Sequence, residues 1–220
     1  NFITYGREVY MSVVFNQDIS ILTQLLNLID AIKAGSVEVA WVLGLLWVIQ
    51  ILNSAANNAL CVLGIVPRNP LGLFGILFAP FIHAGFSHLF FNSIPFFLLL
   101  TFMLTFGVHQ TVCVTLMVMV LGGLGVWLFG RKSIHVGASA LIMGYMGFIM
   151  YKGYYASDLS SLLIGIVSFY YLGSILFSLI PTGGRSSWEG HLFGFLAGIF
   201  AAHYGCMPPF DGLASYFMSL

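Results

Sequence analysis

Charged side chains are scarce in this chain. Of its 220 residues only 6% are charged, while 60% are hydrophobic, and the mean hydropathy is +1.00. A soluble domain carries about 25% charged residues, so this chain has too few to cover a surface that faces water. The formal net charge is zero, and no basic run is present that would bind nucleic acid. These shortages predict a multi-pass integral membrane protein with lipid as its solvent and no nucleic-acid partner.

Patterns that bind metals are also missing. The three cysteines are far apart in the sequence, whereas zinc sites usually draw on pairs at short spacing. The HExxH motif of zinc proteases does not occur. We therefore expect no metal and no cofactor. One alternative stays open, a membrane protein that binds a metal or haem through His83, His88 and His191.

Six apolar runs approach the roughly 20 residues that a transmembrane helix needs. Together they predict an all-α membrane protein with a bundle of six transmembrane helices. The fourth run is short, so its helix is expected to begin inside the membrane, at the floor of a water-filled cavity. The runs cover residues 37–54, 87–106, 111–129, 138–151, 159–180 and 190–204.

The segments outside these runs have different patterns. Residues 1–36 repeat apolar side chains at helical spacing, and Gly35 is a stop signal. This predicts an amphipathic segment that lies on the membrane surface or packs on the end of the bundle. Residues 57–86 are apolar but broken by proline and glycine, so we expect a first loop in the membrane interface. Residues 37–207 would form one helical domain, followed by a short tail at 208–220.

Polar side chains stand at the start of three of the predicted helices. His88 and Asn92, in HAGFSHLFFN, are four residues apart and share one helix face. Ser139 begins the fourth run in HVGASALIMG, and His191 begins the sixth in WEGHLFGFLAG. A serine becomes a good nucleophile when a histidine takes its proton. Each residue alone could serve only packing, but together they favour Ser139 as nucleophile and His191 as base.

The same chemistry needs donors that hold the oxyanion formed when a serine attacks a carbonyl. His88, Asn92 and the backbone N–H of Ser139 are the candidates. His83, one turn earlier than His88, is expected to tie loops together. Glu189 precedes His191 by two residues and so points to nearly the opposite side of the helix, which predicts a loop or interface residue rather than a third member of a triad.

Small residues mark one face of the fourth and sixth runs. Gly194 and Gly198 leave the sixth helix flat, and Ala140, Gly144 and Gly147 do the same on the fourth. Such faces let membrane helices approach closely. Close approach is what a hydrogen bond of roughly 3 Å between a serine and a histidine on these helices requires.

The three motifs in this order resemble those of the rhomboid family of intramembrane serine proteases. They read His83-x4-His88-x3-Asn92, then Gly137-x-Ser139, then His191-x2-Gly194-x3-Gly198. The resemblance covers roughly residues 37–205 and implies a Ser139–His191 dyad without a carboxylate. It also implies an oxyanion site on the second helix and a first loop partly in the membrane. Transmembrane proteins would be the substrates, and the cell membrane the location.

Three departures from the family pattern bear on substrate preference and efficiency. Ala140 stands where most rhomboids have a second glycine. Met143 stands where many have a tyrosine that stacks on the catalytic histidine, so it is a candidate substrate-binding or base-supporting residue. The Trp-Arg pair common in the first loop is absent, and Arg68 occupies the neighbouring region. A rhomboid-like protein that binds membrane clients without cutting them is the second reading, although such relatives generally lack the serine or the histidine.

Overall fold

The long elements of this protein are helices. The computed structural model describes residues 2–156, 158–180 and 187–205, with side chains from residue 21 onward. Within these ranges, extended backbone pairs only in an isolated bridge between Ile65 and His135. Four helical segments are long and apolar enough to cross a membrane: Ile21–Ala55, Phe86–Thr105, Val108–Phe129 and Leu159–Leu179. The predicted all-helical membrane protein is confirmed, while the count of six spans stays a prediction.

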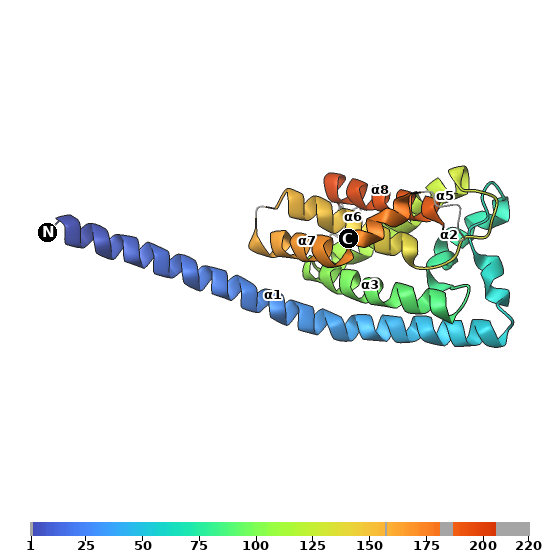
Figure 1. Ribbon diagram of the computed structural model, residues 1–220, viewed down its shortest axis with the longest axis horizontal. Helices are drawn as coiled ribbons and strands as arrows, with labels where there is room; N and C mark the ends of the chain where they lie inside the picture. Colours follow the sequence, from blue (N-terminus) through green and yellow to red (C-terminus); the bar gives the residue numbers. More distant parts are fainter. Residues whose placement is uncertain (1, 157, 181–186, 206–220) are drawn as a thin grey trace, which may run out of the picture.

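Helix α1 runs without a break over Phe2–Ala55, and its N-terminal part extends beyond the bundle in Figure 1. The stop predicted at Gly35 is wrong. Gly35 is buried, and a Cβ on it would lie 3.3 Å from the side chain of Leu104 in α3, Phe86–Thr105. Glycine inside a helix costs about 1 kcal/mol relative to alanine, and the close packing of α1 on α3 offsets that cost.

The first loop is built from short helical turns rather than a span. It packs inward through Ile65 and Ile76 against Val126 and exposes Leu71 and Phe74 on its outer side. Apolar side chains on that outer side fit an apolar surrounding, and the placement of this loop in the membrane interface stays a prediction. The turns are η1 Ala59–Leu63, η2 Pro70–Leu73, α2 Gly75–Phe78 and η3 Ala79–Phe81.

The third membrane-length segment joins three helical pieces end to end. These are α4 Val108–Met117, the π-helical turn η4 Val118–Gly122, and α5 Gly123–Phe129. A π turn inserts one extra residue per turn and often lies near a functional site. Here it brings Gly122 against the backbone of Gly194, where an added Cβ would lie 3.3 Å from the Cα of Gly194.

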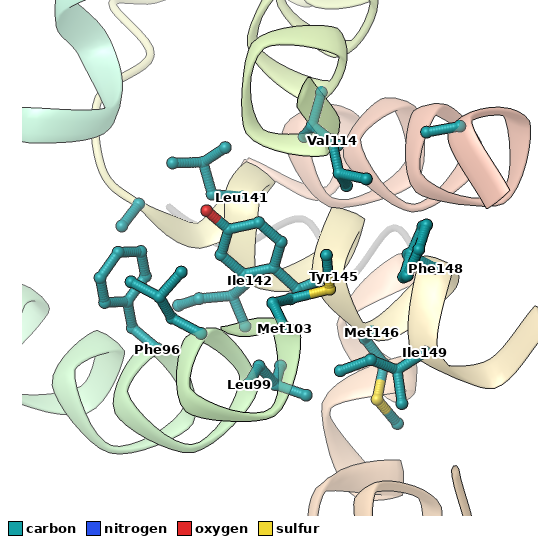
Figure 2. Packing of buried hydrophobic residues seen from close by; sticks show 14 of the residues in the cluster. Phe96, Leu99, Met103, Val114, Leu141, Ile142, Tyr145, Met146, Phe148 and Ile149 are labelled. Atoms are coloured by element: carbon teal, nitrogen blue, oxygen red, sulfur yellow. The ribbon is translucent and has the colours of Figure 1, made fainter. Parts of the chain in front are cut away.

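Helix α6, Ser139–Tyr154, is the centre of the bundle and contacts α3, α4, α7 and α8. Every residue from Leu141 to Ile149 is buried. Figure 2 shows Tyr145 and Phe148 of α6 among Leu99 of α3 and Val114 of α4. A helix that is apolar all round belongs in a core, so the residue that begins α6 rests on a firmly packed element. The remaining elements are α7 Leu159–Leu172, η5 Gly173–Leu179 and α8 Trp188–Tyr204.

The close approach that the small residues predict between α6 and α8 is present. A Cβ on Gly194 would lie 2.2 Å from the carbonyl oxygen of Ala140, and one on Gly198 only 1.9 Å from that of Gly144. Lipid gives no hydrophobic driving force between helices, so tight backbone packing of this kind is a main source of association. The backbones of α6 and α8 are therefore in close contact near the N-terminal ends of both helices.

Candidate active site

A cavity of about 560 Å³ lies at the N-terminal ends of α3, α6 and α8. Ser139, His191, His88 and Asn92, the predicted nucleophile, base and oxyanion donors, all line it. Residues that are distant in the sequence therefore meet at one polar space. Ser87 in the first turn of α3 also lines it. Further lining residues come from the loops that border it: Ala84, Gly85, Arg131, Ser133, Ile134, His135, Val136 and Ser187.

Ser139 is the first residue of α6, and a glycine brings it close to α3. Gly137 has a φ of +116°, in the region that favours glycine. A Cβ on Gly137 would lie 2.6 Å from Cε1 of His88 and 3.4 Å from Nδ2 of Asn92. The first N–H groups of a helix have no partner within it and attract negative charge. The N-terminus of α6 and the two α3 side chains therefore face the same space.

His191 has a defined orientation and tautomer. Its Nδ1 lies 3.1 Å from the carbonyl oxygen of Ser178. A carbonyl can only accept, so Nδ1 carries the hydrogen and Nε2 of the neutral ring holds the free lone pair. Ser178 was missed by sequence reasoning, because it acts through a backbone atom that every residue has.

The hydroxyl of Ser139 and the ring of His191 share the cavity without a hydrogen bond between them in the part of the chain described here. Catalytic hydrogen bonds are often long in a free enzyme and tighten when substrate binds. A catalytic pairing of Ser139 with His191 stays a prediction, and it would need other contacts to hold the two side chains within reach of one another.

Asn92 carries a buried donor that is not in use. Its Nδ2 has no hydrogen-bond partner among the described residues. Leaving a buried donor unsatisfied costs about 1–3 kcal/mol, and such a group in a cavity wall is available to a ligand. The ring of His88, one turn earlier on α3, packs edge-on against that of His83 at 5.2 Å between centroids.

His83 connects three parts of the chain. Its Nε2 accepts the N–H of Ala138 at 3.3 Å, and its carbonyl oxygen accepts the side-chain amide of Asn53 at 3.0 Å. Burial, and to a smaller extent the neighbouring His88, lowers the pKa of His83 to about 4. The ring is therefore neutral near pH 7, as its acceptor role toward Ala138 requires.

Met143 is buried, with 1% of its surface exposed, and it is not one of the residues that line the cavity. The hydroxyl of Ser178 lies 4.0 Å from its sulfur. The contacts of Met143 therefore reach His191 through Ser178, and a direct role in substrate binding stays a prediction.

Glu189 is a correction to the sequence analysis. Instead of lying in a loop or an interface, it is a buried residue of α8. Its Oε1 accepts the backbone N–H of Arg131 at 3.2 Å and lies 3.5 Å from Nε of the same residue. Glu189 stands in the first turn of α8, where the helix dipole favours a carboxylate. The pair joins the loop before Ser139 to the start of α8.

The histidines do not assemble into a metal site in the described part of the chain. No group of three or more His, Cys, Asp or Glu side chains is placed there to hold a metal ion.

Comparison with known proteins gives one matching family model and several similar proteins. The model of the Rhomboid domain matches residues 70–208. Uncharacterized proteins from Mycobacterium bovis and Mycobacterium tuberculosis are 34% identical over 178 residues, which is 77% of this chain and 74% of theirs. An uncharacterized protein from Mycobacterium leprae is 32% identical over 77% of this chain and 70% of its own length.

Proposed function

The chain belongs to the rhomboid family, and on that basis we propose that it is an intramembrane serine endopeptidase. It would cleave the transmembrane segments of other membrane proteins in the cell membrane, with Ser139 as nucleophile and His191 as base. The observation that supports this best is that the two side chains line one cavity together with the unused donor of Asn92. A purely structural set of polar residues would be expected to satisfy one another.

The reaction follows from the tautomer of His191. As Oγ of Ser139 attacks the peptide carbonyl carbon, its proton passes to Nε2, and Nδ1 keeps its hydrogen bond to Ser178. The imidazolium then gives that proton to the leaving amine, which departs and leaves an ester on Ser139. Water attacks the ester with His191 again as base, so the acid product leaves and the hydroxyl is restored.

The oxyanion formed in each half of the reaction needs donors that are already in place. The Nδ2 of Asn92, the ring of His88 and the N–H of Ser139 would supply them. Donors aimed at developing charge in a site away from bulk water act strongly, and losing one commonly costs about 10²–10³-fold in kcat.

A six-span arrangement explains how water reaches this site within lipid. Helices α6 and α8 contain 16 and 17 residues, about 24–26 Å at 1.5 Å per residue, whereas the hydrocarbon core is about 30 Å thick. If the C-terminal ends of both lie at the opposite face of the membrane, their N-termini would lie below the near surface. The cavity above them would hold the water that hydrolysis consumes.

Labelling with a fluorophosphonate probe, followed by mass spectrometry of the modified peptide, tests this proposal. The wild-type protein should be labelled on Ser139, and a Ser139→Ala variant should not be labelled. Cleavage of a model transmembrane substrate in proteoliposomes should disappear in the same variant. Equal cleavage by Ser139→Ala would exclude Ser139 as the nucleophile. Neither label nor cleavage with the wild-type protein would favour a client-binding protein without protease activity, and metal analysis of the purified protein would test the alternative of a histidine-bound metal.

A further inference from the structure

A second histidine and a second serine form a hydrogen-bonded pair in the wall of the cavity. His135 is buried and lies four residues before Ser139. Its Nε2 is 3.1 Å from the carbonyl oxygen of Arg131 and its Nδ1 is 2.6 Å from Oγ of Ser187. Because the carbonyl can only accept, Nε2 carries the hydrogen, and Nδ1 accepts the hydroxyl hydrogen of Ser187.

Ser187 also belongs to α8. It is the N-cap, and its Oγ accepts the N–H of Gly190 at 3.2 Å. Its carbonyl oxygen accepts the backbone N–H of His191 at 3.2 Å. Oγ of Ser133 also lies 3.2 Å from Nε2 of His135 and shares the hydrogen that Nε2 donates to the Arg131 carbonyl. With that tautomer, hydrogen bonds run from Gly190 to Ser187 to His135 to the Arg131 carbonyl.

The loop that carries His135 is held on its other side as well. The N–H and carbonyl of His135 both pair with Ile65 at 2.9 Å. The ion pair of Arg131 with Glu189 adds a second connection to the first turn of α8. A displacement of the loop would have to break contacts with both the first loop and α8.

We propose that His135 and Ser187 are positioning residues whose hydrogen bond sets the separation of the two reacting side chains. This inference rests on the proposed protease function. Each partner precedes a reacting residue by four positions, and the reacting pair is not itself hydrogen-bonded in the described structure. Below the cavity, Gly194 packs on Ala140 and fixes the distance between α6 and α8. The hydrogen bond between His135 and Ser187 fixes the distance between the starts of the same two helices at the mouth of the cavity.

Removing the bond should affect turnover more than substrate affinity. A displacement of about 1 Å at a reacting centre can cost about 10²-fold in rate. We expect His135→Ala and Ser187→Ala to lower kcat and the rate of fluorophosphonate labelling of Ser139 by about tenfold to a hundredfold, with KM within about twofold. Because both remove the same contact, the double variant should be no slower than the slower single variant.

Conservative variants separate positioning from simple stability. Ser187→Thr keeps both the cap and the hydroxyl and should restore activity. Ser187→Gly keeps an acceptable N-cap residue but has no hydroxyl, and should be as slow as Ser187→Ala while remaining folded. The matched control is Asp158→Ala. It removes the cap of α7, where Asp158 accepts the N–H of Ser161 at 2.8 Å, and should lower thermal stability without lowering kcat.

The outcomes distinguish this inference from the proposed function. If the wild type is labelled on Ser139 and Ser187→Gly is labelled equally fast, the positioning role is wrong and the protease stands. The same conclusion follows if Asp158→Ala loses as much kcat as Ser187→Ala for an equal loss of thermal stability. If the wild type carries the label on Ser187, or no label, the proposed function itself fails and this inference fails with it.

Discussion

Nδ1 of His191 donates its hydrogen to the carbonyl oxygen of Ser178 across 3.1 Å. In a Ser-His-Asp triad a buried carboxylate holds the tautomer and also stabilises the imidazolium. Here a neutral carbonyl fixes the tautomer but supplies no full charge. In the proposed reaction His191 would therefore act as base with no carboxylate bonded to Nδ1 among the described residues, which would place more of the barrier reduction on the oxyanion donors.

Replacing His191 with glutamine should remove catalysis while preserving the fold. Glutamine keeps a polar side chain at the position but cannot take the proton of Ser139, so kcat should fall by roughly 10²–10⁴-fold, the usual contribution of a general base. Turnover of a transmembrane substrate in proteoliposomes is the measurement. His203→Gln, near the other end of α8, is the control and should keep normal turnover. A His191→Gln protein with a tenth or more of wild-type kcat would rule out the role.

Asn92→Ala should lower turnover without lowering stability. Loss of one oxyanion donor costs roughly 10²-fold in kcat. The fold should lose no hydrogen bond from Nδ2 of Asn92, because this atom makes none in the described structure. We expect an unchanged or higher melting temperature by thermal unfolding in detergent. Thr101→Val on the same helix removes another buried, unpartnered oxygen and should change stability in the same direction with normal kcat. Normal kcat in Asn92→Ala would mean that this side chain only packs.

Hydropathy and motif spacing predicted most of the framework because lipid imposes simple rules. The ends of α3 and of the α7–η5 segment lie within one residue of the predicted runs, since a run of about 20 apolar residues has few other structures in a membrane. The unbroken course of α1 through Gly35 was missed. A glycine predicts the end of a helix unless the neighbouring helix that it packs against is known.

The candidate site was predictable only in part, for a similar reason. Ser139, His191, His88 and Asn92 stand in local motifs, and all four line the cavity. Ser178 contributes a backbone carbonyl, which leaves no trace in the sequence. Bonds such as that between His135 and Ser187 join residues that are far apart in the chain, so no local spacing indicates that they meet.

Gly198→Ala should separate α6 from α8. The new methyl group would lie 1.9 Å from the carbonyl oxygen of Gly144, and backbone atoms cannot move aside as a flexible side chain can. Overpacking of this kind costs about 1–3 kcal/mol, and we expect a lower melting temperature together with loss of cleavage. Gly44→Ala in α1 is the matched control, because a methyl there meets no atom within 4 Å. Equal behaviour of the two variants would contradict close packing as the cause.

Acidification should destabilise the protein through His83. The folded-state pKa of about 4 is below the ordinary value of about 6.5, so between these limits the unfolded chain binds more protons. The contribution of His83 to the free energy of unfolding is therefore fully present above about pH 6.5. It is lost as the pH falls toward 4, by up to roughly 3 kcal/mol at about 1.4 kcal/mol per pH unit. Protonation would also place a hydrogen on Nε2, which could then no longer accept the N–H of Ala138.

Thermal unfolding from pH 7.5 to pH 4.5 measures this effect. His83→Gln offers an amide oxygen to Ala138 and does not titrate, so its melting temperature should depend less on pH than that of the wild type. The difference between the two curves isolates His83 from the other histidines. Identical pH dependence in both proteins would show that His83 contributes nothing to acid sensitivity.

Met143 is expected to support His191 indirectly, by packing beneath Ser178. Its side chain is buried, and its sulfur lies 4.0 Å from the Ser178 hydroxyl. Met143→Ala would leave a void there and let the carbonyl that orients His191 shift. A tenfold lower kcat, equivalent to about 1.4 kcal/mol of barrier, is the expected result, with KM unchanged. Met143→Leu conserves volume, which usually costs less than about 1.5 kcal/mol, and should keep most of the activity.

Met146→Ala is the matched control for this prediction. Met146 is equally buried on α6 and belongs to the hydrophobic core, away from the cavity lining. Both alanine variants remove the same atoms, and each should lower the free energy of unfolding by roughly 2–5 kcal/mol. If the void acts through the Ser178 carbonyl, only Met143→Ala lowers kcat in assays run well below both melting temperatures. Equal kcat losses in the two variants would reduce Met143 to a packing residue, since stability alone would then account for both.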